Sequence, residues 1–192
     1  MAEYDWQDAI TVEDRSYLCG YCGKDTAPSK SYRAKSHKGI ILICSKCSKP
    51  TFIDSYGKQT PKARLGAEIQ GISNSGVAAL YDEARECTAV GAYTAAVMVC
   101  RKILMNLAVD QKADEGKVFT YYVDYLADNG YVPPQGRKWV DAIRKRGNEA
   151  NHEIEVKDER DAKLMLDFTS GLLRFNYELP SLLEEDNKLS NP

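Results

Sequence analysis

Four of the six cysteines in this 192-residue chain stand in two Cys-x-x-Cys pairs, Cys19 with Cys22 and Cys44 with Cys47. Each pair can turn back so that both sulfurs face one point, and glycines after Cys19 and Cys22 relieve the first turn. This spacing is typical of metal ligands, and four thiolates complete a tetrahedron that leaves no open position for water or substrate. The sequence therefore predicts one structural Zn²⁺ ion held by Cys19, Cys22, Cys44 and Cys47.

The residues beside the second pair predict the surrounding fold. Residues 40–43 read as a strand that leads into Cys44, and a second strand is expected at 51–53, after Pro50. Two knuckles joined by a hairpin make a zinc ribbon, which we place at residues 1–60 with an N-terminal extension. Because this segment holds few large apolar side chains, we expect metal binding and folding to be one event.

Positive charge gathers in the same part of the chain. Residues 24–64 carry ten Lys or Arg against two Asp, a balance of +8, whereas the whole chain has a net charge of −2. Such segregation is typical of a surface that meets polyanions, although a small module also collects solubilising charge. An expected loop at 30–38 interleaves an aromatic residue with cations, so it is either a phosphate-contacting and base-stacking loop or a solvated hairpin tip. The candidate nucleic-acid-binding residues are Lys30, Tyr32, Arg33, Lys35 and Lys38.

Apolar residues recur at helical spacing in the remainder of the chain, after an expected linker at 61–73. The pattern predicts helices at 74–90, 92–110 and 117–128, a fourth from Pro133 to about His152, and a fifth from an Asp158-x-x-Asp161 cap to Pro180. Short connections favour an antiparallel bundle of about five helices at 74–179, followed by an acidic, flexible tail at 180–192. The expected fold class is mainly α, with a small β ribbon before the bundle.

The fourth helix carries a polar line. Arg144, Asn148 and His152 are spaced four residues apart, which places them on one face of a continuous helix. A guanidinium that holds phosphate, an amide that orients it and an imidazole that moves a proton are what metal-independent RNA cleavage requires. In the structural alternative, His152 interacts with the helix dipole and Asn148 forms hydrogen bonds inside the bundle.

Several segments resemble the family called domain of unknown function 4145, over roughly residues 70–178. They are Tyr81-Asp82-Glu83-Ala84, the helix with Gly91, Ala95-Ala96 and Arg101-Lys102, the motif Ile143-Arg144-x-x-Gly147-Asn148-x-x-x-His152, and the closing helix with Leu166, Phe168, Leu172-Leu173 and Tyr177. That family is grouped with the HEPN superfamily, whose all-helical members include ribonucleases of toxin, CRISPR and phage-defence systems and many noncatalytic nucleotide-binding or scaffolding proteins. The resemblance implies a HEPN-like helical domain.

The resemblance also implies which residues a nuclease would use. In active HEPN ribonucleases an arginine directly precedes a polar residue, a histidine follows four positions later, and two protomers build one composite site. Asn148 and His152 fit this pattern, but Gly147 holds the arginine position, and Arg146 and Arg144 are the nearest substitutes.

Two hypotheses follow. In the first, the protein is a noncatalytic module that binds nucleic acid or protein and dimerises, in phage defence or in a regulatory complex. In the second, it is a metal-independent endoribonuclease that uses Arg144 or Arg146 with Asn148 and His152. Both place RNA first among nucleic-acid partners and expect a homodimer or larger assembly. No apolar run reaches membrane-spanning length and no signal-peptide pattern begins the chain, so we expect a cytoplasmic protein without a membrane partner.

Overall fold

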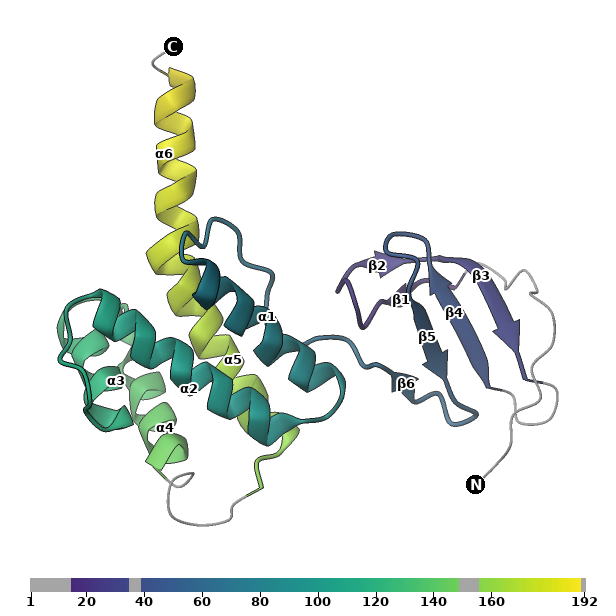
Figure 1. Cartoon of the computed structure of the whole chain (residues 1–192), viewed down its shortest axis with the longest axis horizontal. Helices are drawn as coiled ribbons and strands as arrows, with labels where there is room; N and C mark the ends of the chain where they lie inside the picture. Colours follow the sequence, from purple (N-terminus) through teal and green to yellow (C-terminus); the bar gives the residue numbers. More distant parts are fainter. Residues whose placement is uncertain (1–14, 35–38, 149–155, 191–192) are drawn as a thin grey trace. The chain divides into compact units, whose positions relative to one another are not determined.

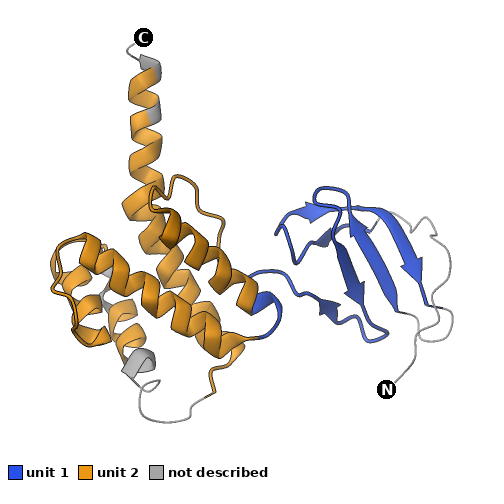
Figure 2. Cartoon of the chain, in the orientation of Figure 1, with its two compact units in different colours: residues 1–64, 88–91 blue, residues 65–87, 92–192 orange. Residues whose placement is uncertain are grey.

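The computed structural model describes residues 15–34, 39–148 and 156–190 (Figure 1). The chain divides into two compact units, one of residues 1–64 with 88–91 and one of residues 65–87 with 92–192 (Figure 2). The described residues 15–64 are called the ribbon unit below, and the second unit is called the helical unit. The order of a small β region followed by a helical bundle confirms the expected fold class.

The ribbon unit contains two antiparallel sheets. A two-stranded sheet pairs β1 (Tyr17–Leu18) with β2 (Asp25–Thr26) around the first cysteine pair. A four-stranded sheet runs in chain order through β3 (Pro28–Arg33), β4 (Ile40–Cys44), β5 (Pro50–Ile53) and β6 (Gln59–Thr60). The predicted strands at 40–43 and 51–53 correspond to β4 and β5. Short connections join each of these strands to the next strand in the chain, which is its antiparallel neighbour in the sheet.

Strand β3 replaces part of the expected loop at 30–38, so the loop prediction was wrong for residues 30–33. The segment Pro28–Arg33 contains no β-branched residue, which removed the usual strand signal. It forms a strand because it lies at the edge of the sheet, where a proline can begin a strand and an exposed lysine protects the edge from further pairing.

The core of the ribbon unit is small. Leu42, Cys44 and Ile53 lie on one face of the four-stranded sheet and pack with Tyr17 and Cys19. All five are buried, but the cluster contains only these five fully buried members within the described part of the unit. So little buried apolar area agrees with a unit that depends on a metal for its stability.

The helical unit has a larger core centred on its longest helix. Its helices are α1 (Ser75–Ala89), α2 (Tyr93–Asp110), α3 (Phe119–Asp128), α4 (Arg137–Asn148, after a 3-10 turn at Pro134–Gly136), α5 (Glu159–Leu173) and α6 (Leu179–Ser190). Helix α2 packs against α3 and α5, and its Ile103, Leu104 and Leu107 are fully buried. The predicted cap of α5 forms, because the Asp158 carboxylate accepts a hydrogen bond of 2.9 Å from the Asp161 N–H.

The C-terminal segment is helical from Leu179 to Ser190, and Pro180 does not end the helix. A π-helical turn at Arg174–Glu178 joins α5 to α6, and the Leu179 N–H donates to the Arg174 carbonyl five residues earlier. Because Pro180 then lies in the first turn of α6, its missing N–H costs no intrahelical hydrogen bond. The π turn explains why a proline that normally stops a helix is tolerated here.

Most of the expected linker at 61–73 packs onto the helical unit. Leu65, Ile69 and Ile72 contact the helical core, and the Tyr81 hydroxyl donates a hydrogen bond of 2.7 Å to the Ala67 carbonyl. The segment has no regular secondary structure, which is why its sequence looked like a connector. Among the helices of the described residues, none combines the length and the apolarity needed to cross a membrane.

Candidate functional site

The four predicted metal ligands converge. The sulfurs of Cys19, Cys22, Cys44 and Cys47 all lie within 4.8 Å of one another. Two of the distances, from Cys19 Sγ to Cys47 Sγ and from Cys22 Sγ to Cys44 Sγ, are 3.8 Å. Sulfurs arranged tetrahedrally around a metal at about 2.3 Å stand about 3.8 Å apart, so the cluster fits one tetrahedral metal ion.

The backbone builds the same turn at both cysteine pairs. The Gly23 N–H donates to the Cys19 carbonyl and the Ser48 N–H donates to the Cys44 carbonyl, each at 2.9 Å. The N–H of Cys19 and that of Cys44 each donate to the carbonyl five residues further on, at 3.1 Å in both cases. The fourth residue after each of these cysteines has a positive φ, 67° at Gly23 and 57° at Ser48. The two turns differ chiefly in that glycine occupies this position in one of them and serine in the other.

This difference predicts that Ser48→Gly will stabilise the metal-loaded protein. A serine in the left-handed region is strained by its Cβ, while glycine removes the strain at some cost in unfolded-state entropy. The expected gain in the free energy of unfolding is roughly 0.5–1 kcal/mol, measured by urea denaturation with metal present. The reverse change at the matched position, Gly23→Ser, is expected to cost a similar amount. Equal losses from both changes would contradict the account.

The electrostatics favour a thiolate at Cys44. Burial raises the pKa of Cys44, but hydrogen bonds from the backbone N–H groups of Cys47 and Lys46 lower it by a larger amount. The net result is a pKa of about 6, below the ordinary value for a thiol. The Lys46 N lies 3.4 Å from Cys44 Sγ. Burial, together with the neighbouring thiols, raises the pKa of Cys47 to about 12. The turn thus directs backbone dipoles at one sulfur and stabilises the ionised form that binds metal.

The surface of the ribbon unit is rich in cations. Besides Arg15 at the start of the unit, six of them are exposed, and within the described ranges none of these six forms an ion pair with a carboxylate: Lys24, Lys30, Arg33, Lys46, Lys49 and Lys58. Lys49 Nζ lies 5.1 Å from the centre of the Tyr21 ring. The Asp54 carboxylate accepts hydrogen bonds from the N–H groups of Tyr56 and Lys58 at 2.9 and 2.8 Å, so it is engaged in holding a turn.

The predicted nucleic-acid-binding residues fall into two groups. Lys30, Tyr32 and Arg33 lie on β3, where Lys30 and Arg33 are exposed and Tyr32 is half-buried. Lys35 and Lys38 lie outside the described residues. The first three therefore belong to a sheet with a defined register and not to a hairpin tip.

The polar line of the fourth helix is described only in part. Arg144 lies on α4 with Nε 3.4 Å from Asp124 Oδ1 and Nη1 3.8 Å from Asp141 Oδ1. Two carboxylates therefore already offset its charge. Arg146 and Asn148 are near the end of α4, and His152 lies outside the described residues. The predicted group of Arg144, Arg146, Asn148 and His152 therefore stays a prediction.

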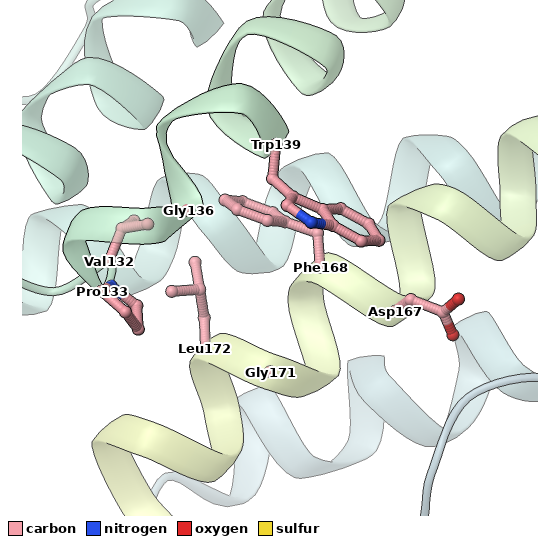
Figure 3. A pocket seen from close by; sticks show the side chains of 8 residues that line it. All are labelled: Val132, Pro133, Gly136, Trp139, Asp167, Phe168, Gly171 and Leu172. Atoms are coloured by element: carbon pink, nitrogen blue, oxygen red, sulfur yellow. The ribbon is translucent and has the colours of Figure 1, made fainter.

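Sequence reasoning missed a hollow in the helical unit, shown in Figure 3. It has a volume of about 190 Å³ and is lined by Val132, Pro133, Gly136, Trp139, Asp167, Phe168, Gly171 and Leu172. Its one charged residue, Asp167, pairs with Lys163 through oxygen and nitrogen atoms 2.5 Å apart. The lining is otherwise apolar, so the hollow offers packing contacts and no group for catalysis.

Comparison with known proteins adds one finding. A family model described as a domain of unknown function, DUF4145, matches residues 82–191. No curated protein matches the chain, and no solved structure matches it. The matched segment runs from helix α1 through the end of α6 and covers more than half of the sequence. The chain therefore belongs to the DUF4145 family.

Proposed function

We propose that this protein is a noncatalytic nucleic-acid-binding module, stabilised by one structural Zn²⁺ ion and assembled from two chains. The ribbon unit binds the nucleic acid, with RNA as the favoured class, and the helical unit carries the dimer contact. The observation that carries the proposal is the set of six exposed cations of the ribbon unit, none of which forms an ion pair within the described ranges. Neutralising phosphates and releasing their counterions is the main source of affinity for such a surface.

Zinc is the metal that the cysteine site suits best. Four soft thiolates in a tetrahedron favour Zn²⁺ over the hard cations Mg²⁺ and Ca²⁺, which prefer oxygen ligands. Since the protein supplies all four ligands, the metal has no position left for a reacting water. It supports the ribbon fold, and the fold in turn positions the cations. None of the six cysteines forms a disulfide, which agrees with a cytoplasmic setting, where thiols stay reduced.

The described part of α4 supports a noncatalytic helical unit. Arg144 is paired with Asp124 and Asp141, so a phosphate that bound it would compete with these two carboxylates. The endoribonuclease alternative then depends on Arg146 with Asn148 and His152. The noncatalytic reading also agrees with Gly147, which holds the position where active HEPN ribonucleases have arginine.

Dimer formation is supported by an apolar stripe at the end of the chain. Phe175, Leu179 and Leu182 follow one another at spacings of four and three residues, and their exposed fractions are 45%, 43% and 51%. This is the spacing at which helices pair through a heptad seam. Two chains of a defence or regulatory assembly could join through this stripe, which would present two ribbon units to one nucleic acid.

The experiment that tests the proposal measures retention and cleavage of RNA together. Zinc-loaded protein is mixed with a labelled RNA pool without added divalent metal, beside a His152→Ala variant of equal thermal stability. We expect both proteins to retain RNA of unchanged length, and sedimentation of the same preparations to give the mass of two chains. Cleavage by the wild type that disappears in the variant would establish the endoribonuclease instead, and absence of any retained RNA would refute the binding function.

A further inference from the structure

The hollow of the helical unit and the exposed apolar stripe of Phe175, Leu179 and Leu182 lie on one continuous helical segment. Helix α5 passes through the π turn into α6 without a break. Gly171 and Leu172 line the hollow, and Phe175 follows them by four and three residues. Residues at these spacings share a face of a helix. The stripe therefore begins where the hollow ends.

The hollow is open because α5 lacks a side chain at Gly171. Among the described residues, a Cβ added there would meet no atom within 4 Å outside the backbone of its own helix. Trp139 of α4 and Leu172 of α5 point into the same space, and Trp139 is 41% exposed (Figure 3). An apolar cavity of about 150 Å³ is large enough for benzene, so this hollow of about 190 Å³ has room for a leucine side chain.

Helix α6 carries leucines that the rest of the helical unit leaves uncovered. Leu182 and Leu183 are 51% and 67% exposed. A different side of α6 is covered by the segment before α1, where the Gln70 N–H donates to Glu178 Oε1 at 3.0 Å and a side chain at Gly71 would collide with Ser181. Exposed apolar side chains that are contiguous along a helix indicate an interaction surface.

The hollow and the leucines are spaced for a twofold pair. Leu183 follows Gly171 by twelve residues, roughly 18 Å along the helix, and Tyr177 is midway between them. In a symmetric dimer, residue i of one copy contacts residue j of the other and j contacts i. A twofold axis beside Tyr177 would place Leu183 of each copy at the partner's Gly171 and Phe175 at the partner's Leu179. The face is therefore complementary to itself in antiparallel orientation.

The exposed apolar area of this face is sufficient for a stable dimer. Its large side chains are between 41% and 67% exposed, which leaves roughly 450 Å² of apolar surface uncovered for side chains of this size. An interface of ordinary size buries about 800 Å² per partner, of which about 57–65% is apolar. The side chains counted are Trp139, Phe175, Leu179, Leu182 and Leu183.

We propose that a second copy of this chain covers the face in antiparallel orientation, with the partner's Leu182 and Leu183 in the hollow beside Trp139 and Gly171. The inference rests on the dimer of the proposed function and adds the orientation of the two copies and the hollow as the site that receives the partner. Each copy fills the hollow of the other, so the contact forms twice in every dimer.

The first test fills the hollow from within the chain. Because a Cβ at Gly171 has free space and glycine is a poor helix former, zinc-loaded Gly171→Leu is expected to fold with an unchanged or raised thermal midpoint. Its added side chain excludes the partner's Leu183, so the dimer dissociation constant from sedimentation is expected to rise at least about tenfold. Leu183→Gln is expected to have the same effect from the other side of the contact. Met98→Gln is the matched control, because Met98 is 45% exposed on α2, outside the hollow and the stripe.

The second test reports the orientation of the two copies. Chains with Pro133→Cys, at an exposed residue that lines the hollow, are mixed with Leu183→Cys chains under mild oxidation. Both carry Cys87→Ser so that this half-buried thiol does not compete. We expect a disulfide between the two kinds of chain. Leu183→Cys chains that link to one another and not to Pro133→Cys would show a parallel pair and overturn the inference.

The outcomes separate this inference from the proposed function. A wild type and a Met98→Gln variant of two chains, beside Gly171→Leu and Leu183→Gln variants of one chain with undiminished thermal midpoints, support the inference. If Gly171→Leu lowers the thermal midpoint, Leu183→Gln decides. Variants that remain dimers as tight as the wild type overturn the inference, while the proposed dimer then stands on another surface. A wild type of one chain refutes the dimer as well, and RNA retention by the same preparation shows separately whether the binding function stands.

Discussion

Replacing Cys44 with serine is expected to remove the bound metal and unfold the ribbon unit, while the helical unit remains folded. A structural zinc site contributes roughly 10–16 kcal/mol of apparent binding free energy, and a serine hydroxyl is a poor substitute for a thiolate. The ribbon core of five buried residues cannot offset that loss, whereas the helical unit has its own extensive core. Zinc per chain is measured by atomic emission, and hydrogen exchange then compares residues 39–60 with α2.

Cys87→Ser provides the matched control for this prediction. Cys87 is half-buried on α1 and belongs to the helical unit, outside the cysteine site. This variant is expected to keep one zinc ion per chain and a protected ribbon unit. The account would be wrong if Cys44→Ser retained a full zinc ion and slow exchange in β4 and β5, or if both variants lost metal equally.

Neutralising the cations of the ribbon unit is expected to weaken RNA binding by roughly 100- to 1000-fold near 0.1 M salt. The variant replaces six residues with glutamine: Lys24, Lys30, Arg33, Lys46, Lys49 and Lys58. A single RNA strand cannot contact all six cations at once, because Lys30 and Arg33 project from opposite faces of the sheet. The expected loss of affinity therefore assumes only three or four phosphate contacts. Fluorescence anisotropy with single-stranded RNA gives the dissociation constant.

A variant with the same change in net charge controls for long-range attraction. It carries glutamine at six exposed positions of the helical unit: Lys102, Lys112, Lys117, Lys138, Arg160 and Lys163. Because screening limits interactions beyond about 10 Å at this salt concentration, its binding is expected to weaken only about two- to threefold. Equal losses in the two variants would mean that net charge, and not the ribbon surface, determines affinity.

The cysteine site and most helices could be predicted because their signals are local. Two Cys-x-x-Cys pairs require no knowledge of the fold, and the Asp158 cap is formed by a carboxylate and an N–H three residues apart. The expected helices at 74–90, 92–110 and 117–128 agree with α1, α2 and α3 within two residues at each end. In each of these helices, the apolar residues that recur at helical spacing are the ones that pack in the core.

The features that the sequence did not reveal depend on neighbours distant in the chain. Strand β3 is stabilised by pairing with β4 and not by its own composition. Pro180 predicts a helix end until the π turn at Arg174–Glu178 is known. Tyr32 and Phe52 align on the same residue of β4, Ile41, and such a register cannot be read from composition. The ion pair of Arg144 with Asp124 likewise joins two helices.

The salt dependence of RNA binding by the zinc-loaded wild-type chain tests the central claim most directly. Dissociation constants for one single-stranded RNA are measured between roughly 50 and 200 mM salt. Three or four phosphate contacts predict that the logarithm of the binding constant falls linearly with the logarithm of salt concentration, with a slope of about −2 to −3. No saturable binding at the lowest salt, or a slope near zero, would contradict a function based on the cations of the ribbon unit.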